Sequence, residues 1–280
     1  MLVAAARFEA CVIEACQSVQ GGAAYLEQSD IEFAGCTLQD TTCGGGIYAE
    51  SMMRLALDGC LLTRIVPDDC SSSGYELAAL HANLSTVEIT NSTFDDNKAL
   101  LVDVDPVEAS GLTLHQCATT ISGSVFTRNG VDASYPFDLG GALAAVGGTL
   151  DIQTSQFLDN DNETRGGALA LRGVDVTIAD ALFEDNSSAD SYWGGAIYVS
   201  PLAATTLRVE RASFRENSAA DGGAAYIGAG QASFLECLFA DNDVTAYYYE
   251  TGTGGALFVD PLASLYAEHC TFVDNRAHGN

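Results

Sequence analysis

Aromatic side chains gather just before the Gly-Gly-Ala segments of this chain, where their rings could bind a ligand. An aromatic face stacks on the apolar face of a sugar, and a partly exposed Tyr or Trp can anchor a protein partner. The alternative is that each ring folds back and covers the edge of the fold. The candidate ligand-binding residues are Tyr135, Phe137, Tyr192, Trp193, Tyr247, Tyr248 and Tyr249, and Tyr75 lies in the same setting.

Carboxylates that could hydrolyse a polysaccharide occur only as neighbours in sequence. An inverting glycosidase needs two carboxyl groups set apart to leave room for a water molecule. Asp68-Asp69 and Asp95-Asp96 are adjacent pairs, and consecutive residues of a strand face opposite ways. These pairs therefore do not predict a hydrolase.

Basic and imidazole groups are equally dispersed. A polyuronate lyase needs Ca²⁺, a base and a basic groove, but the arginines are spread singly, with Arg208, Arg211 and Arg215 closest to a cluster. The histidines are also isolated in sequence, at positions His81, His115, His269 and His278. We predict no catalytic residue and keep a carbohydrate-active enzyme, a polysaccharide lyase or glycoside hydrolase, as the alternative function.

Acidic tracts such as residues 159–163 and 241–243 offer the oxygen ligands that Ca²⁺ prefers. The asparagine in each tract, however, belongs to a repeated motif described below. We therefore expect no cofactor and no specific metal site, only non-specific association of Ca²⁺. No Cys-x-x-Cys or His-x-x-His spacing that would predict a zinc site is present.

A Phe-x-x-Asn motif alternates with the Gly-Gly-Ala segments and defines the elements that hold these residues. Its phenylalanines are Phe94, Phe126, Phe157, Phe183, Phe214, Phe239 and Phe272. The distance from glycine to phenylalanine is nearly fixed, as in Gly140 to Phe157 and Gly166 to Phe183, whereas the distance from phenylalanine to the next glycine varies. A constant half and a variable half indicate stacked coils whose insertions all leave from one edge.

Apolar residues at every second position of the constant half predict short strands, for example Val174, Val176 and Ile178. Parallel strands need a long connection, which a coil of this kind provides by turning corners. We predict an all-β fold, a right-handed parallel β-helix (a solenoid) of about ten coils with variable loops on one edge. At roughly 4.8 Å per coil it would be a rod about 50 Å long.

Three columns of residues then stack from coil to coil. The phenylalanines form an apolar internal stack, with Leu38 and Leu62 in the same place in early coils. Small residues stand two positions before them, and glycine at the opposite corner allows unusual backbone angles. A ladder of amide side chains is predicted from Asn97, Asn129, Asn160, Asn186, Asn217, Asn242 and Asn275.

Nine cysteines leave their oxidation state open. Five occupy the small-residue column, where side chains in register point the same way and disulfide geometry is poor; we expect free thiols there. Cys43, Cys70 and Cys117 are better candidates for disulfide pairing.

Of the four Asn-x-Ser/Thr sequons, the one at Asn162 lies in an expected loop and is predicted to be the best glycosylation acceptor.

The composition of the chain narrows the classes of molecule that it could bind. The formal net charge of -27 disfavours nucleic acid and anionic membranes. We find no 18-residue apolar run and no convincing signal peptide, so contact with a membrane is expected only through regions outside this chain. Residues 1–280 are predicted to be one domain, with degenerate coils at 1–93 and regular coils at 94–280, and an excerpt of a longer repeat protein.

The alternation of Gly194-Gly195-Ala196-Ile197 with Phe214-Arg215-Glu216-Asn217, and its equivalents in other coils, resembles the polymorphic outer membrane protein repeat of chlamydial autotransporter passengers. The resemblance is clear from about Phe94 onward. It implies surface display and adhesion, although the chain lacks the signal peptide and C-terminal membrane barrel of that family.

From these features we predict a non-enzymatic extracellular or cell-surface β-helix, located at the outer membrane if the source is bacterial. It would act as an adhesin or a structural stalk. Its partner would be a glycan or a surface protein of a host or neighbouring cell, bound through the variable loops.

Overall fold

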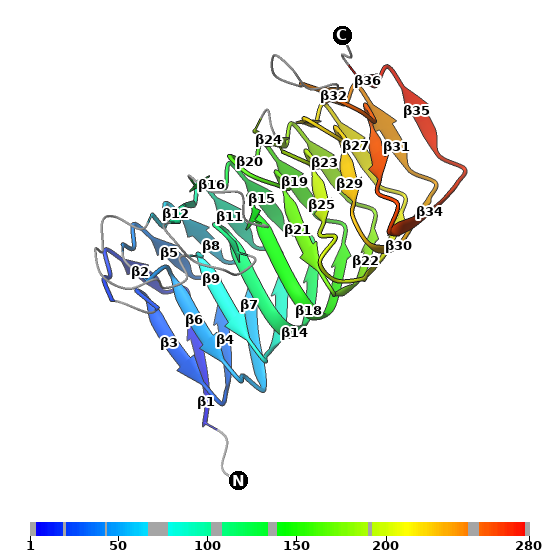
Figure 1. Ribbon diagram of the computed structural model, residues 1–280. Helices are drawn as coiled ribbons and strands as arrows, with labels where there is room; N and C mark the ends of the chain where they lie inside the picture. The colour runs from blue at the N-terminus through cyan, green and yellow to red at the C-terminus, as the bar shows by residue number, and fades with distance from the viewer. Residues whose placement is uncertain are drawn as a thin grey trace.

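The computed structural model is a rod of stacked coils that runs from the N-terminus at one end to the C-terminus at the other (Figure 1). It describes residues 4–18, 21–42, 44–66, 78–101, 108–133, 139–189, 192–245 and 252–277. All strand pairings in this part of the chain are parallel, and it contains no helix, hence none that could cross a membrane. The predicted fold, a right-handed parallel β-helix, is confirmed.

The largest sheet has 17 strands, because most coils contribute two strands to it. In two coils the two strands are joined into one long strand, β14 and β18, each of which spans both halves of the sheet. The strands of this sheet are β1 (Ala4–Glu9), β3 (Ala24–Glu27), β4 (Ser29–Ala34), β6 (Ile47–Glu50), β7 (Arg54–Asp58), β9 (Leu80–Asn83), β10 (Thr86–Thr90), β14 (Leu112–Ser122), β18 (Leu143–Gln153), β21 (Leu169–Arg172), β22 (Asp175–Ala179), β25 (Ile197–Val199), β26 (Thr205–Glu210), β29 (Ala225–Ile227), β30 (Gly230–Leu235), β33 (Leu257–Val259) and β34 (Ala263–Glu268).

The second sheet has ten strands, one for each coil, so the described residues form the ten coils that the repeat spacing predicts. These strands are β2 (Val12–Glu14), β5 (Thr37–Gln39), β8 (Leu61–Thr63), β11 (Thr93–Asp95), β15 (Val125–Thr127), β19 (Gln156–Leu158), β23 (Leu182–Glu184), β27 (Ser213–Arg215), β31 (Leu238–Ala240) and β35 (Thr271–Val273).

Two smaller sheets complete the coil between the asparagine corner and the insertions. The seven-stranded sheet contains β12 (Lys98–Leu101), β16 (Gly130–Ala133), β20 (Asp161–Asn162), β24 (Ser187–Ser188), β28 (Ser218–Ala219), β32 (Asp243–Val244) and β36 (Arg276–Ala277). A further pair is formed by β13 (Glu108–Ala109) and β17 (Leu139–Gly140).

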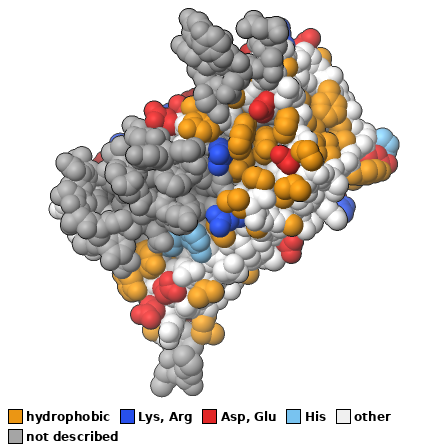
Figure 2. Space-filling view, in the orientation of Figure 1, with side chains coloured by type: hydrophobic (Ala, Val, Ile, Leu, Met, Phe, Trp, Pro, Cys, Tyr) orange, Lys and Arg blue, Asp and Glu red, His pale blue; other side chains and the backbone are white. Residues whose placement is uncertain are grey.

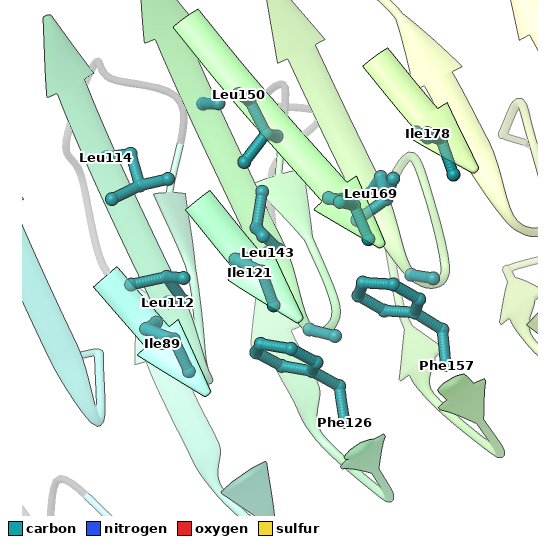
Figure 3. Packing of buried hydrophobic residues seen from close by; sticks show 14 of the residues in the cluster. Ile89, Leu112, Leu114, Ile121, Phe126, Leu143, Leu150, Phe157, Leu169 and Ile178 are labelled. Atoms are coloured by element: carbon teal, nitrogen blue, oxygen red, sulfur yellow. The ribbon is translucent and has the colours of Figure 1, made fainter. Parts of the chain in front are cut away.

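The core fills the inside of the coils with apolar side chains in register. Leu112, Leu143 and Leu169 pair on successive strands, and the rings of Phe126 and Phe157 lie beneath them (Figure 3). These two rings are stacked with centroids 4.9 Å apart and planes 8° apart. That distance equals the usual separation of neighbouring strands, so the stacking follows directly from the register of the second sheet.

The asparagine corner is held by a continuous amide ladder. Asn129 Nδ2 donates to Asn160 Oδ1 at 3.0 Å and to the carbonyl oxygen of Phe94 at 2.9 Å. Asn160 Oδ1 also accepts from the backbone N–H of Asn129. The pattern recurs from Asn97 to Asn275, and the interior asparagines are fully buried. Each buried side-chain amide of the ladder thereby finds a partner.

The two glycines of the corner at Gly194 have different roles. Gly194 has φ of 72°, which is the left-handed conformation that glycine adopts without steric cost. Gly195 does not need this freedom; a Cβ atom there would lie 2.2 Å from the carbonyl oxygen of Gly223 on the next coil. The second glycine is therefore required because neighbouring coils approach closely at this point, and not because of its own backbone conformation.

Thiols in the small-residue column are free, as expected. Cys60 Sγ donates to the carbonyl oxygen of Phe33 on the preceding coil at 3.2 Å, and Ser92 Oγ makes the equivalent bond to that of Leu57 at 3.4 Å. Cys117, which sequence spacing favoured for pairing, is also free and buried, because it faces the core and donates to Ala82. That prediction is wrong for Cys117; Cys43 and Cys70 lie outside the described residues.

Candidate functional site

The described part of the variable edge contains two of the candidate aromatic residues, Tyr192 and Trp193, both half-buried. Trp193 directly precedes the corner glycine Gly194. Its carbonyl oxygen accepts a hydrogen bond from Gly166 N at 3.0 Å, so its backbone belongs to the ordered corner. The other candidates, Tyr135, Phe137, Tyr247, Tyr248 and Tyr249, lie outside the described residues, as does Tyr75.

A column of rings on the outer face of the largest sheet lies next to Trp193. Tyr198 in β25, Tyr226 in β29 and Phe258 in β33 pair in register on three successive coils. Their neighbours Ile197 and Val199 belong to the core, so strand alternation directs these rings outward. The sequence signal was an aromatic residue one position after the first apolar residue of each strand, and our sequence interpretation missed it.

Trp193 packs onto this column rather than extending into solvent. Its ring centroid lies 5.0 Å from that of Tyr226, with planes 13° apart, and 6.2 Å from that of Tyr198. Tyr226 in turn stacks on Phe258 at 5.0 Å. Tyr198 is fully buried and Tyr226 is 5% exposed, whereas Trp193 and Phe258 are half-buried. Trp193 thus helps to cover the buried ring of Tyr198, and it extends the aromatic surface formed by Tyr226 and Phe258.

Arg165 lies over the ring of Trp193. Its guanidinium carbon is 4.5 Å from the Trp193 ring centroid and 5.5 Å from that of Tyr198, which is cation–π geometry. Asn162 positions this arginine, because its Nδ2 donates to the Arg165 carbonyl oxygen at 2.8 Å. Asn162 is fully buried, so the prediction that it is the best glycosylation acceptor is wrong.

An acidic side chain, that of Asp260, lies beside the stacked rings. Tyr226 Oη donates to Asp260 Oδ2 at 3.2 Å. Burial, and then the negative charge of Asp260, raise the pKa of Tyr226 to about 12. The phenol therefore remains a neutral hydrogen-bond donor at physiological pH.

Hydrophobic side chains gather on this face over the C-terminal half of the rod, with basic groups at the border of the patch (Figure 2). Exposed leucines lie in the turns that follow β25 and β33: Leu202 is 71% exposed and Leu262 is 69% exposed. We refer to Arg165, Trp193, Tyr226, Phe258 and Asp260 as the ring surface. It offers flat apolar faces with charged groups beside them, suited to binding and without a nucleophile.

A second outward stack lies at the other end of the same face. Tyr25, Tyr48 and His81 are stacked on successive coils, and His115 lies 5.3 Å from His81 between ring centroids. His81 and His115 are isolated in sequence, but the coil register brings them together in space. His269 has φ of 55° at a corner, which agrees with a role in the turn.

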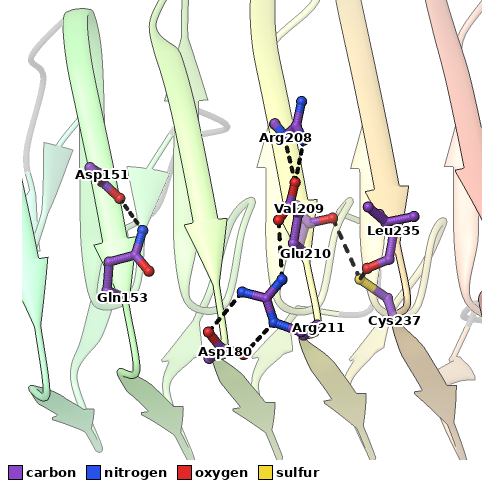
Figure 4. A network of polar contacts seen from close by, with 9 residues as sticks. All are labelled: Asp151, Gln153, Asp180, Arg208, Val209, Glu210, Arg211, Leu235 and Cys237. Atoms are coloured by element: carbon purple, nitrogen blue, oxygen red, sulfur yellow. Dashed lines mark hydrogen bonds and ion pairs between the residues drawn. The ribbon is translucent and has the colours of Figure 1, made fainter.

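Of the three arginines nearest to a cluster, Arg208 and Arg211 are occupied by ion pairs (Figure 4), and Arg215 Nε donates to Ser213 Oγ at 3.0 Å. Arg211 Nε lies 2.7 Å from Asp180 Oδ1, and Arg208 Nε donates to Glu210 Oε1 at 2.7 Å. The Arg211 guanidinium holds the pKa of Asp180 below its ordinary value. Among the described residues, no group of three or more His, Cys, Asp or Glu side chains could hold a metal ion.

The fold and the ring surface define a parallel β-solenoid with an aromatic patch beside its variable edge. Residues 180–200 match the model of the Chlamydia polymorphic membrane protein repeat. This stretch holds one Phe-x-x-Asn motif, at Phe183, and one Gly-Gly-Ala-Ile corner, at Gly194. Neither the curated proteins nor the solved structures gave a match. The repeat and the fold suggest a surface or extracellular protein, and the repeat family is not an enzyme family.

Proposed function

We propose that this chain is a segment of a non-enzymatic, adhesin-like protein or stalk at the cell surface, at the outer membrane if its source is bacterial. It binds a glycan or a surface protein of a host or neighbouring cell through its variable edge. The supporting observation is the stacking of Trp193 on Tyr226, 5.0 Å away, beside the edge from which the insertions leave.

A rigid support explains why these rings suit binding. Tyr226 and Phe258 are fixed by strands in register, and Trp193 is fixed by its stacking and by its corner. Little side-chain entropy is then lost when a ligand covers them, so the contact contributes more to affinity. Loops on a rigid scaffold commonly carry binding residues, and Tyr247, Tyr248 and Tyr249 belong to the next insertion along the chain.

The experiment compares attachment of three proteins to glycan arrays and to intact cells: the wild type, Trp193→Ser and Tyr266→Ser. Tyr266 is a matched control because it is 61% exposed and lies in β34, away from the ring surface. We expect Trp193→Ser to weaken attachment about tenfold, as loss of a central aromatic anchor does, and Tyr266→Ser to leave it unchanged.

Equal attachment by all three proteins, with the folded state verified by circular dichroism, would contradict the ring surface as the binding site. Replacing Tyr247, Tyr248 and Tyr249 with Ser tests the insertion separately, and unchanged attachment would exclude those three rings. Enzymatic removal of glycans from the cells distinguishes the two partners, because only a protein ligand would survive it.

A further inference from the structure

We propose a second binding site, for an extended glycan that carries free amino groups, on the outer face of the largest sheet away from the ring surface. A groove with a volume of about 440 Å³ runs here across β10, β14, β18, β22 and β26. It crosses five successive coils. It is formed by the second halves of the sheet strands, whereas the ring surface lies on the first halves, so this inference does not depend on the proposed function.

Two rows of outward side chains line the groove in strict register. One row is Thr86, Ala118, Thr149, Asp175 and Thr206. The other is Glu88, Thr120, Asp151, Thr177 and Arg208. The second row therefore presents a hydroxyl or charged group about every 4.8 Å along the rod, and the first row does so at every coil except that of Ala118.

The position of the groove decides how a ligand can be recognised. β14, β18 and β22 each have strand partners on both sides, so their backbone groups are already paired and cannot bind a peptide as an added strand. Recognition must come from side chains. Threonine hydroxyls both donate and accept hydrogen bonds, and their repeated spacing fits a linear ligand with hydroxyl groups at regular intervals, namely an oligosaccharide.

The charged side chains of the groove determine which oligosaccharides it can bind. Two charged groups of the groove are neutralised from outside it: Arg54 Nη2 lies 2.8 Å from Glu88 Oε2, and Glu210 pairs with Arg208. Asp151 accepts a hydrogen bond from the Gln153 amide at 2.7 Å (Figure 4), which leaves its charge in place.

Asp175 is exposed and makes no ion pair or side-chain hydrogen bond with the described residues. Together with Asp151 it gives the groove two carboxylates without a counter-charge. Ammonium groups complement them, whereas uronates or sulfates would be repelled. A glycan with free amino groups therefore fits the groove better than a neutral or acidic glycan.

The test is calorimetric titration of the protein with a β-1,4-linked glucosamine hexamer at physiological salt and about pH 6, where the amino groups of the sugar are largely protonated and exposed aspartates stay ionised. We expect saturable binding to this hexamer, with weaker binding of the N-acetylated hexamer and none of a galacturonate hexamer. The double variant Asp151→Asn/Asp175→Asn should lower the affinity about tenfold or more, because it removes two charge-assisted contacts.

The matched control is Asp159→Asn/Asp185→Asn, which changes the net charge by the same amount. Both aspartates are exposed at corners with φ near 55°, a conformation that Asn tolerates. An equal loss in both double variants would show attraction by overall charge only and overturn the proposal, as would no binding by the wild type or equal binding of all three hexamers.

Two further variants separate the groove from other surfaces. Thr177→Val keeps the shape and strand preference but removes one hydroxyl, and we expect a several-fold loss of affinity. Trp193→Ser alters the ring surface and should leave hexamer binding unchanged. If Trp193→Ser instead abolished it, the hexamer would bind the ring surface and the groove would be excluded; failure of the groove alone leaves attachment through the ring surface intact.

Discussion

The side-chain amide of Asn186 donates to Oδ1 of Asn217 on the next coil at 3.0 Å, and its own Oδ1 accepts from Asn160 on the preceding coil at 2.9 Å. A second hydrogen of the same amide bonds to the carbonyl oxygen of Phe157. One side chain thus joins three coils at a site fully shielded from water. Only an amide supplies both donors and an acceptor at one point.

Replacing Asn186 with Ala should therefore destabilise the rod by about 2–4 kcal/mol, since it leaves buried donors and acceptors of the adjacent coils without partners. Asn275, at the exposed end of the ladder, provides the comparison and should give a smaller loss. Urea unfolding followed by circular dichroism measures both. Equal losses at the two positions would contradict a ladder whose strength depends on burial.

The phenylalanine stack should tolerate Leu but not Ala. Phe183 lies between Phe157 and Phe214 at 4.9 and 4.8 Å and is fully buried. Phe183→Ala should reduce the free energy of unfolding by about 3–5 kcal/mol through the cavity it creates. Phe183→Leu should reduce it by only about 1 kcal/mol, because Leu38 and Leu62 fill the same column in this chain. Similar losses for both variants would contradict this packing account.

A strained corner offers a stabilising change. Thr154 is exposed with φ of 47°, a left-handed conformation that is unfavourable for a β-branched residue. Thr154→Gly should raise the free energy of unfolding by about 1 kcal/mol. At the equivalent corner, Gly123 has φ of 56° and a Cβ atom there would lie 2.9 Å from Asn91 Oδ1, so Gly123→Ala should lower it. Thermal melts of the two variants that shift in the same direction would argue against strain.

The sequence predicted the coil well because its constraints recur in every repeat. The Phe and Asn columns face the core and the glycine corner leaves little room for a side chain, so the copies from Phe94 onward show nearly the same residues. The ring surface was only partly predicted. Trp193 was recognised as a loop-edge ring, but Tyr198, Tyr226 and Phe258 occupy an outward column that holds Tyr, His, Thr or Ala in other coils and so has no constant residue type. Only the coil register, which insertions of unequal length conceal in the sequence, brings them together next to Trp193.

The acidity of Tyr226 gives a pH dependence that can be measured directly. Its pKa is raised by burial and by Asp260 to about 12, above the value near 10 of an exposed tyrosine. The neutral phenol therefore stabilises the folded state fully below about pH 10, and this contribution is lost as the pH rises from 10 towards 12.

Asp260→Asn should lower the pKa of Tyr226, because it removes the negative charge beside the phenol while burial remains. Phenolate absorbance during alkaline titration, with the Tyr226→Phe variant subtracted, reports this group alone. A midpoint that does not move in Asp260→Asn would show that the carboxylate has no part in the shift.

The central claim is that this β-helix binds its ligand without chemically altering it. The most direct test is to incubate the wild-type protein with each glycan that it binds on an array, with and without Ca²⁺, and to follow the release of reducing sugars. The account predicts binding that is weakened by Trp193→Ser and no release of product from any bound glycan. Release of product by the wild type would contradict it and identify a carbohydrate-active enzyme.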